Sequence, residues 1–286
     1  MMIIHAFFLT SGTNYDTPSI LVKIGLRPGP WGGMHMPCPI QISYLSHSGF
    51  AVRAGDTLLV FDDAGGKPAA GDSLQTGRVT RSLINEFQRT IFFVSHAHAD
   101  HFSPAIYDMS DAERVHYVLG DDLPERYSGY RMSPGDTLSL GGAEIVAHGS
   151  TDEGVSFLVA IDGWSLFHAG DLNLWHWREE STLKEIEQAE KDYEEAVKPL
   201  ENALIDFAFF PLDPRMGEMY DAGALHFLMG IKPRVMIPMH WWGRADVALE
   251  FARRNRSRHA EILALTKPGQ TVAATKGDSG EILLEI

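Results

Sequence analysis

Cysteine is nearly absent from this chain, since Cys38 is the only one in 286 residues. A disulfide framework within one chain is therefore excluded, and so are zinc sites built from several thiolates. Any metal must be held by histidine and carboxylate side chains, and the sequence contains 13 His and 38 Asp and Glu. The cytoplasm is the compartment that we expect, although a cysteine-poor secreted protein has a similar composition.

Basic residues are also scarce, because 24 Lys and Arg stand against 38 Asp and Glu, which gives a formal net charge of −14. Nucleic-acid binding by phosphate neutralisation needs a basic surface. We therefore expect a small-molecule substrate and no nucleic-acid partner. The basic run at 253–258 is better explained as a helix end, where cations are favourable.

Long apolar runs are missing as well. No stretch approaches the ~20 apolar residues that span a bilayer, so we expect no membrane anchor. The N-terminal apolar run is short and no Lys or Arg precedes Lys23, which makes it a poor signal peptide. The sequence also lacks a P-loop, a dinucleotide fingerprint and a GxSxG motif. It leaves the oligomeric state open, with a homo-oligomer as one outcome.

The chain divides into two unequal parts. Residues 1–38 are rich in Gly and Pro with little periodicity, which indicates a loosely ordered N-terminal extension or an upstream translation artefact. Residues 39–286 alternate short β-type runs with amphipathic segments. Helices are predicted at about 79–89, 178–202, 221–230 and 245–254. Strands dominate the first half and alternate with helices in the second, which indicates one α/β domain of packed sheets with outer helices.

A cluster of histidines follows a buried apolar strand that ends near Ser95. His96, His98, Asp100 and His101 lie within six residues of one another. Two histidines at i and i+2 in an extended turn can converge on one cation, and the next Asp and His can serve a second cation nearby. Imidazole and carboxylate together suit zinc, iron or manganese. A His-rich polar turn is the alternative explanation, but such a cluster is improbable by chance.

Two later strand ends carry further candidate ligands. Asp171 ends the phrase His-Ala-Gly-Asp, and His240 ends the phrase Pro-Met-His. Each is weak evidence alone, because Asp171 can be a turn residue and His240 an ordinary half-buried histidine. In this order after the first motif, both residues favour a metal site.

These motifs resemble those of the metallo-β-lactamase superfamily, and within it the branch of ascorbate-6-phosphate lactonase-like hydrolases. The resemblance covers about residues 40–286 and includes the opening phrase YLSHSGF at 44–50. It implies a four-layer αββα sandwich with two divalent ions at one edge. Zn²⁺ is the expected metal, with Mn²⁺ or Fe²⁺ as alternatives.

The resemblance also implies the role of each ligand. His96 and His98 would serve the first metal position, and Asp171 would bridge the two positions. The second position would be held by Asp100, His101 and His240. A metal-bound hydroxide would attack a small ester, lactone or phosphoester, with Asp100 as ligand and general base.

The sequence departs from the family at Ser150, where many relatives have a third histidine for the first position. Three outcomes are open: Asp152 replaces that ligand, His148 replaces it, or the first position binds metal weakly. We expect Asp152, because Gly149 and Gly154 make this loop pliable. The alternative is that Asp152 is an ordinary turn residue.

Several residues near these motifs are candidates for substrate binding. Trp175 and Trp241 follow two ligand-bearing strand ends and are expected to form an apolar wall, with core packing as the alternative. Arg215 is expected to bind an anionic substrate group, or else to pair with Asp213.

Three further residues have two open interpretations each. His47 either approaches the cleft or is a hydrogen-bonding turn residue. Asp62 or Asp63 either orients a metal-bound histidine or simply ends a strand.

Hydrolysis is the leading function, but three alternatives remain open at this stage. A metal-dependent nuclease is the first, although the acidic balance weighs against it. A metal-binding regulatory protein with a degenerate first position is the second, because of Ser150. Oxygen or redox chemistry at iron is the third.

Overall fold

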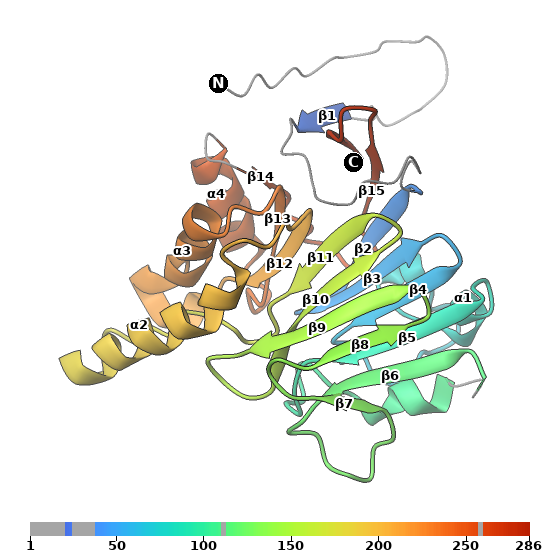
Figure 1. Cartoon of the computed structure of the whole chain (residues 1–286), viewed down its shortest axis with the longest axis horizontal. Coiled ribbons are helices and arrows are strands. Elements are labelled where there is room, and N and C mark those ends of the chain that lie inside the picture. The colour runs from blue at the N-terminus through green and yellow to red at the C-terminus, as the bar shows by residue number, and fades with distance from the viewer. Residues whose placement is uncertain (1–20, 25–37, 110–112, 257–259) are drawn as a thin grey trace.

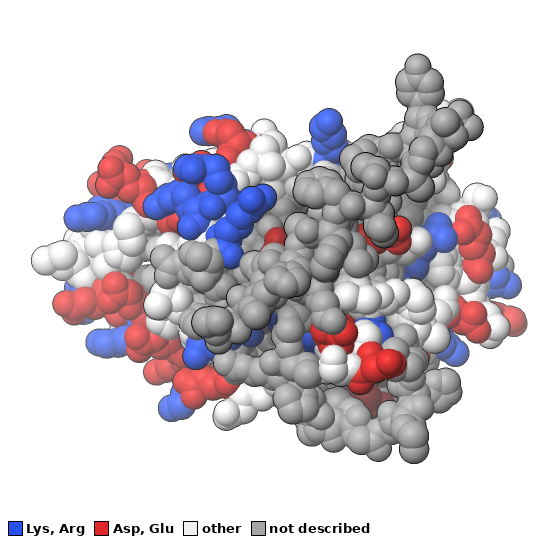
Figure 2. Space-filling view, turned by 90° about the horizontal axis from the view of Figure 1, so that it is seen from above, with Lys and Arg blue, Asp and Glu red and all other residues white. Residues whose placement is uncertain are grey.

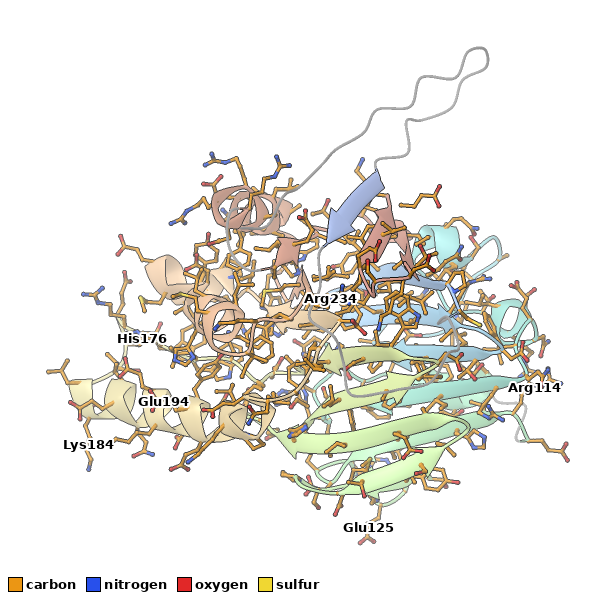
Figure 3. All side chains as sticks on the ribbon, turned by 45° about the horizontal axis from the view of Figure 1, so that its top comes forward. Arg114, Glu125, His176, Lys184, Glu194 and Arg234 are labelled. Atoms are coloured by element: carbon orange, nitrogen blue, oxygen red, sulfur yellow. The ribbon has the colours of Figure 1, made fainter. Side chains whose placement is uncertain are left out.

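Two β-sheets pack face to face in the computed structural model (Figure 1), which describes residues 21–24, 38–109, 113–256 and 260–286. The space between the sheets is filled by a large apolar core to which both contribute, and Figure 3 draws the side chains on the ribbon. Helices lie on the outside. The expected αββα sandwich is therefore confirmed.

The first sheet has nine strands in the order β1-β16-β15-β2-β3-β4-β5-β6-β7. Its half from β4 to β7 is parallel, and its other pairs are antiparallel. β4 and β5 are almost wholly buried, as expected of parallel strands covered on both faces. The strands are β1 (Leu21–Ile24), β2 (Ile40–Ser46), β3 (Gly49–Ala54), β4 (Thr57–Phe61), β5 (Arg89–Val94), β6 (Val115–Gly120), β7 (Tyr130–Met132), β15 (Thr271–Lys276) and β16 (Ile282–Glu285).

The second sheet has seven strands in the order β14-β13-β12-β11-β10-β9-β8. The pairs from β8 to β11 are antiparallel, and those from β11 to β14 are parallel. The strands are β8 (Thr137–Leu140), β9 (Ala143–Gly149), β10 (Val155–Ile161), β11 (Trp164–His168), β12 (Phe207–Pro211), β13 (Val235–Met239) and β14 (Glu261–Ile262).

The longer helices gather on one side of the molecule (Figure 1), where they pack against the second sheet. They are α2 (Leu183–Val197), α3 (Ala222–Gly230) and α4 (Ala245–Asn255). α2 begins at a capping box in which Thr182 and Glu185 satisfy each other's backbone N–H groups, and this explains why it starts later than 178. The first sheet is covered by α1 (Arg81–Ile84) and 3₁₀ turns. α1 is shorter than predicted, because the chain must turn at Asn85 to enter β5.

Part of the expected N-terminal extension belongs to the sheet. β1 pairs antiparallel with β16, so these four residues form an edge strand rather than a loose segment. The backbone oxygen of Cys38 accepts a hydrogen bond from Trp164 at 2.8 Å. Residues 1–20 and 25–37 lie outside the described part of the chain. Within the described residues, the helices are all too short or too polar to cross a bilayer.

The carboxyl ends of the parallel strands hold most of the candidate functional residues. Asp62 follows β4, the His-rich motif follows β5, and Asp171 comes shortly after β11. Asp213 comes shortly after β12, and His240 follows β13. Ligands in open α/β sheets bind at the carboxyl ends of parallel strands, so both sheets present side chains to one edge of the sandwich.

Candidate metal centre

The loop after β5 turns back sharply on itself. The backbone N–H groups of His101 and Phe102 both donate to the carbonyl of His98, at 3.0 and 2.9 Å. This turn brings the rings of His96 and His101 to 4.1 Å between centroids. Residues that are five apart in sequence therefore face the same volume.

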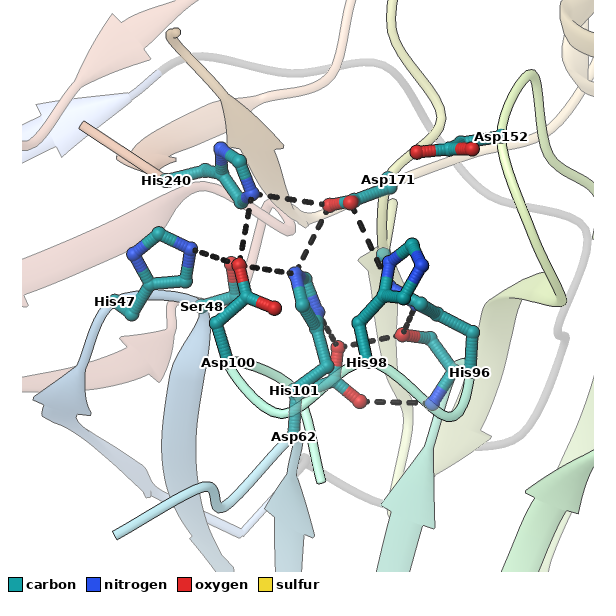
Figure 4. A network of polar contacts seen from close by, with 12 residues as sticks. His47, Ser48, Asp62, His96, His98, Asp100, His101, Asp152, Asp171 and His240 are labelled. Carbon is teal, nitrogen blue, oxygen red and sulfur yellow. Dashed lines mark hydrogen bonds and ion pairs between the residues drawn. The ribbon is translucent and has the colours of Figure 1, made fainter. Parts of the chain in front are cut away.

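The predicted ligands converge in two groups (Figure 4). The donor atoms of His47, Asp100, His101 and His240 lie within 4.8 Å of one another. The donor atoms of His96, His98 and Asp171 form a second group with the same spacing. Six of the seven ligands expected from the sequence are in these groups, His47 joins them, and Asp152 is in neither.

Asp171 lies between the two groups and touches both. Its Oδ1 is 3.0 Å from His101 Nε2 and 3.3 Å from His240 Nε2. Its Oδ2 is 3.5 Å from His96 Nε2. One carboxylate with an oxygen toward each group has the geometry of a bridging ligand.

The donor atoms at the centre are buried but poorly satisfied. Five donor atoms that face one another at this centre have no hydrogen bond of acceptable geometry to any described residue. They are His47 Nε2, His96 Nε2, His101 Nε2, Asp171 Oδ1 and His240 Nε2. Buried polar groups are rarely left unsatisfied without a functional reason. Two divalent cations would satisfy all five, and imidazole with carboxylate is a donor set that zinc, manganese or iron accepts, so these residues fit the expected metals.

The electrostatics of the centre are dominated by the same residues. Burial opposes the charged form of His101, but the carboxylates of Asp171 and Asp62 outweigh it and raise its pKa to about 10. Burial and the neighbouring His101 lower the pKa of His96 to about 4. Burial opposes the charge of Asp171, yet His101, His240 and His96 together hold its pKa well below the usual range.

Asp62 supports the His-rich loop from beneath. Its carboxylate accepts hydrogen bonds from Ser95 N at 2.8 Å, Ser95 Oγ at 2.7 Å and His101 Nδ1 at 2.7 Å. This resolves one open interpretation, because Asp62 orients His101, whereas Asp63 bonds the backbone N–H of Gly65. The contact holds the tautomer of His101 that leaves Nε2 free to bind a metal.

Asp213 has the corresponding place beside His240, and sequence reasoning did not assign it this role. Its Oδ2 is 3.2 Å from His240 Nδ1, and its side chain is fully buried. Arg215 pairs with both oxygens of Asp213. Of the two interpretations of Arg215, the structure therefore shows the pairing with Asp213. The sequence did carry a signal for this role. Asp213 comes shortly after buried β12, which lies next to β13, the strand that leads to His240.

Glycines allow the loops to approach closely around Ser95. A Cβ at Gly170 (φ +55) would lie 2.7 Å from Ser95 Cβ, and a Cβ at Gly154 (φ +68) would lie 2.1 Å from Ser95 O.

His168 holds the loop between β2 and β3 in place, since its Nε2 lies 2.8 Å from Ser48 O. The histidine of the HAGD phrase is therefore structural.

The place of the missing third histidine is not filled by the expected residue. Asp152 is outside the group that contains His96 and His98, and its backbone N–H bonds Ser150 Oγ at 3.3 Å in a tight turn. Figure 4 shows Asp152 beside Asp171 with no drawn contact to either histidine. Glu153 instead reaches His98, with Oε2 3.5 Å from Nε2. Glu153 is itself outside the donor group, and its contact with His98 lies at the exposed rim of the site.

The aromatic wall also differs from expectation. Trp175 lies beside the site, 6.1 Å from the ring of His240, and its Nε1 donates to Asp171 O at 3.1 Å. Trp241 is buried in the core against Tyr44 and does not line the site. Its neighbour Trp242 does, since it is 44% exposed and its ring is 4.7 Å from His47. Because His240 and Trp242 have positive φ, the chain turns sharply here. As a result, Trp242 rather than Trp241 lies beside the site.

Comparison with known proteins gives the same assignment. No family model matches the chain. A UPF0173 metal-dependent hydrolase from Opitutus terrae is 25% identical over 264 residues, which cover 82% of this chain and 99% of that protein. A UPF0173 metal-dependent hydrolase from Pyrococcus furiosus is 26% identical, with 82% and 99% covered.

Solved structures show the same fold. Igni18, a metallo hydrolase from Ignicoccus hospitalis, superposes with a TM-score of 0.59 at 19% identity, covering 82% of this chain and 98% of that one. YhfI from Bacillus subtilis, a metallo-β-lactamase fold protein, gives 0.52 at 13% identity, covering 82% and 98%. The chain therefore has the metallo-β-lactamase fold and is similar over most of its length to proteins named metal-dependent hydrolases.

Proposed function

We propose that this protein hydrolyses a small ester, lactone or phosphoester with two divalent cations, zinc or in its place manganese or iron. The observation that carries the proposal is the pair of donor groups joined by Asp171. The sequence resemblance to ascorbate-6-phosphate lactonase-like hydrolases supports the substrate class.

Each position has its own residues. His96 and His98 would hold a metal at the first position and Asp100, His101 and His240 a metal at the second, with Asp171 between the two donor groups. A divalent metal lowers the pKa of a water ligand from ~15.7 toward ~7 and polarises the substrate oxygen. The protein excludes bulk water from the inner side, where His96 and His101 are fully buried, and admits substrate from the side of the more exposed His98.

The side chain of Asp100 is partly exposed to solvent. The imidazole of His47, whose Nε2 lies 3.2 Å from Asp100 Oδ2, is the main reason that the pKa of Asp100 lies well below the usual range. The carboxylate therefore stays ionised at neutral pH. A carboxylate of low pKa is a weak base. Asp100 therefore orients the attacking water, and it accepts the proton that this water loses only poorly.

The surroundings of the centre suit a small substrate with an anionic group. Trp175 and Trp242 offer apolar surface on two sides of His240. Arg215 is held by Asp213, yet its side chain is 48% exposed and lies 4.4 Å over the ring of Trp242. Its outer N–H groups can bind a carboxylate or phosphate while the inner ones hold Asp213.

A nuclease is less well supported. On the face that Figure 2 shows, acidic and basic side chains are interspersed, in keeping with a net charge of −14. In the basic run near the end of α4, Arg253 pairs with Glu250 at 2.7 Å and Arg254 lies 3.9 Å from Asp221. These cations are already matched by local acids rather than arranged for a phosphate backbone.

A substrate panel tests the proposal. The protein is stripped with a chelator, reloaded with Zn²⁺ or Mn²⁺, and assayed on esters, lactones, phosphomonoesters and phosphodiesters. We expect metal-dependent turnover of at least one class, lost in Asp171→Ala and kept in Asp162→Asn, a control in a surface turn. Turnover that persists without metal, or in Asp171→Ala, would contradict the proposal.

A further inference from the structure

His47 occupies a strained turn beside the metal centre. It lies between β2 and β3 with φ +47, a left-handed backbone conformation that is costly for residues other than glycine. Of the six non-glycine residues with positive φ in the described chain, four surround this centre: His47, Asp62, His240 and Trp242. Such strain concentrates at functional sites because the surrounding structure maintains it there.

The strained turn aims the imidazole of His47 into the second donor group. Its Nε2 is 3.2 Å from Asp100 Oδ2, and its ring centroid is 4.2 Å from that of His240. The backbone is tied to the same place, since His240 N donates to His47 O at 3.2 Å. The position of one residue therefore depends on that of the other.

The contact with Asp100 alone does not account for this arrangement. His47 Nε2 is buried without a well-formed hydrogen bond, and so is the Nε2 atom of His240 next to it. Two imidazoles that face each other without partners leave two acceptor lone pairs unsatisfied, unless a cation lies between them. The donor atoms of both lie within 4.8 Å of those of Asp100 and His101.

We propose that His47 is a ligand of the second metal position through Nε2, an assignment that rests on the metal-dependent function proposed above. The second position then has four donors of its own, His47, Asp100, His101 and His240, besides the shared Asp171. The first position keeps only His96 and His98, with His98 45% exposed.

This assignment gives the two metal positions different roles. A metal site closed by protein ligands is typically structural, whereas a catalytic site keeps an open place for water or substrate. The second position is nearly closed and holds its ion tightly. The first donor group is open toward solvent at His98, so a metal held there would have a free place for water or substrate.

The test uses His47→Gln, whose amide can donate a hydrogen bond to Asp100 but is a poor ligand for a divalent ion. His47→Asn is the second variant, because asparagine tolerates a positive φ and so preserves the turn. His116→Gln is the control, a half-buried histidine on β6 outside both donor groups. Thermal melting of the metal-free proteins establishes that each variant is folded.

The readouts are cobalt affinity by chelator competition and the visible absorption spectrum of the cobalt-loaded protein, which reports coordination. We expect both His47 variants to bind the tighter ion at least about tenfold more weakly, with a changed spectrum, and the control to match wild type. Wild-type affinity and spectrum in a folded His47→Gln overturn the assignment and leave the proposed function standing. Wild-type protein that takes up no cobalt overturns both.

Discussion

Replacing Asp62 with asparagine changes the metal centre without touching a ligand. In the native protein one carboxylate oxygen accepts from both Ser95 Oγ and His101 Nδ1, and the other accepts from Ser95 N. Asparagine has one oxygen and one NH₂ group. If the oxygen keeps the bond to Ser95 N, the NH₂ group faces His101 Nδ1. His101 must then accept at Nδ1 and carry its proton on Nε2, the atom that would bind metal.

The magnitude follows from the lost contact. The bond between Asp62 and His101 is a buried, charge-assisted hydrogen bond of 2.7 Å. Such bonds contribute about 1.5–3 kcal/mol. Replacing a residue that orients a ligand typically costs about 10- to 100-fold in metal affinity, which corresponds to about 1.4–2.8 kcal/mol. The two estimates agree, so we expect a loss of this size at the second position.

Isothermal titration or chelator competition measures the effect, with circular dichroism as the check on folding. The matched control is Asp63→Asn, the adjacent acid, which accepts a bond from Gly65 N and none from a histidine. We expect normal metal affinity in the control. Wild-type affinity in a folded Asp62→Asn would refute the idea that Asp62 sets the tautomer of His101.

Three more predictions concern the loop, the extension and pH. Glu153→Gln should lower occupancy of the first position more than Asp152→Asn, as measured by metal content under limiting chelator, and equal effects would argue against the observed contact with His98. A chain that starts at Met36 should keep full turnover and lose a little stability with β1, so a collapse in turnover would count against it. Burial raises the pKa of Asp63, which means that its ionisation costs stability once the pH rises above the unfolded value near 3.8. Asp63→Asn should therefore melt higher than wild type at pH 7 but not at pH 3, and an equal gain at both would contradict this cause.

The sequence was enough to predict the architecture and the convergence of the candidate ligands because both depend on local patterns. β13 is apolar throughout and is followed directly by His240, and β5 is apolar from Ile91 to Val94, with Ser95 and His96 next in the chain. Carboxyl ends of parallel strands meet at one edge, so the order of the motifs along the chain indicates that they are close in space.

Other features depend on backbone turns that no pattern encodes. The positive φ of His240 decides that Trp242, and not Trp241, lies beside the site. The partner of His240 is Asp213, which is 27 residues away by its number and adjacent only through the pairing of β12 with β13. The choice between Asp152 and Glu153 likewise depends on one tight turn at Ser150.

Anomalous diffraction from crystals grown with zinc is the most direct test of the metal centre. The account predicts a peak within about 2.0–2.2 Å of the Nε2 atoms of His101 and His240, and a second, weaker peak beside His96 and His98 with Asp171 between them. A zinc-loaded crystal with no peak between these two donor groups, or with its peaks elsewhere on the protein, would contradict it.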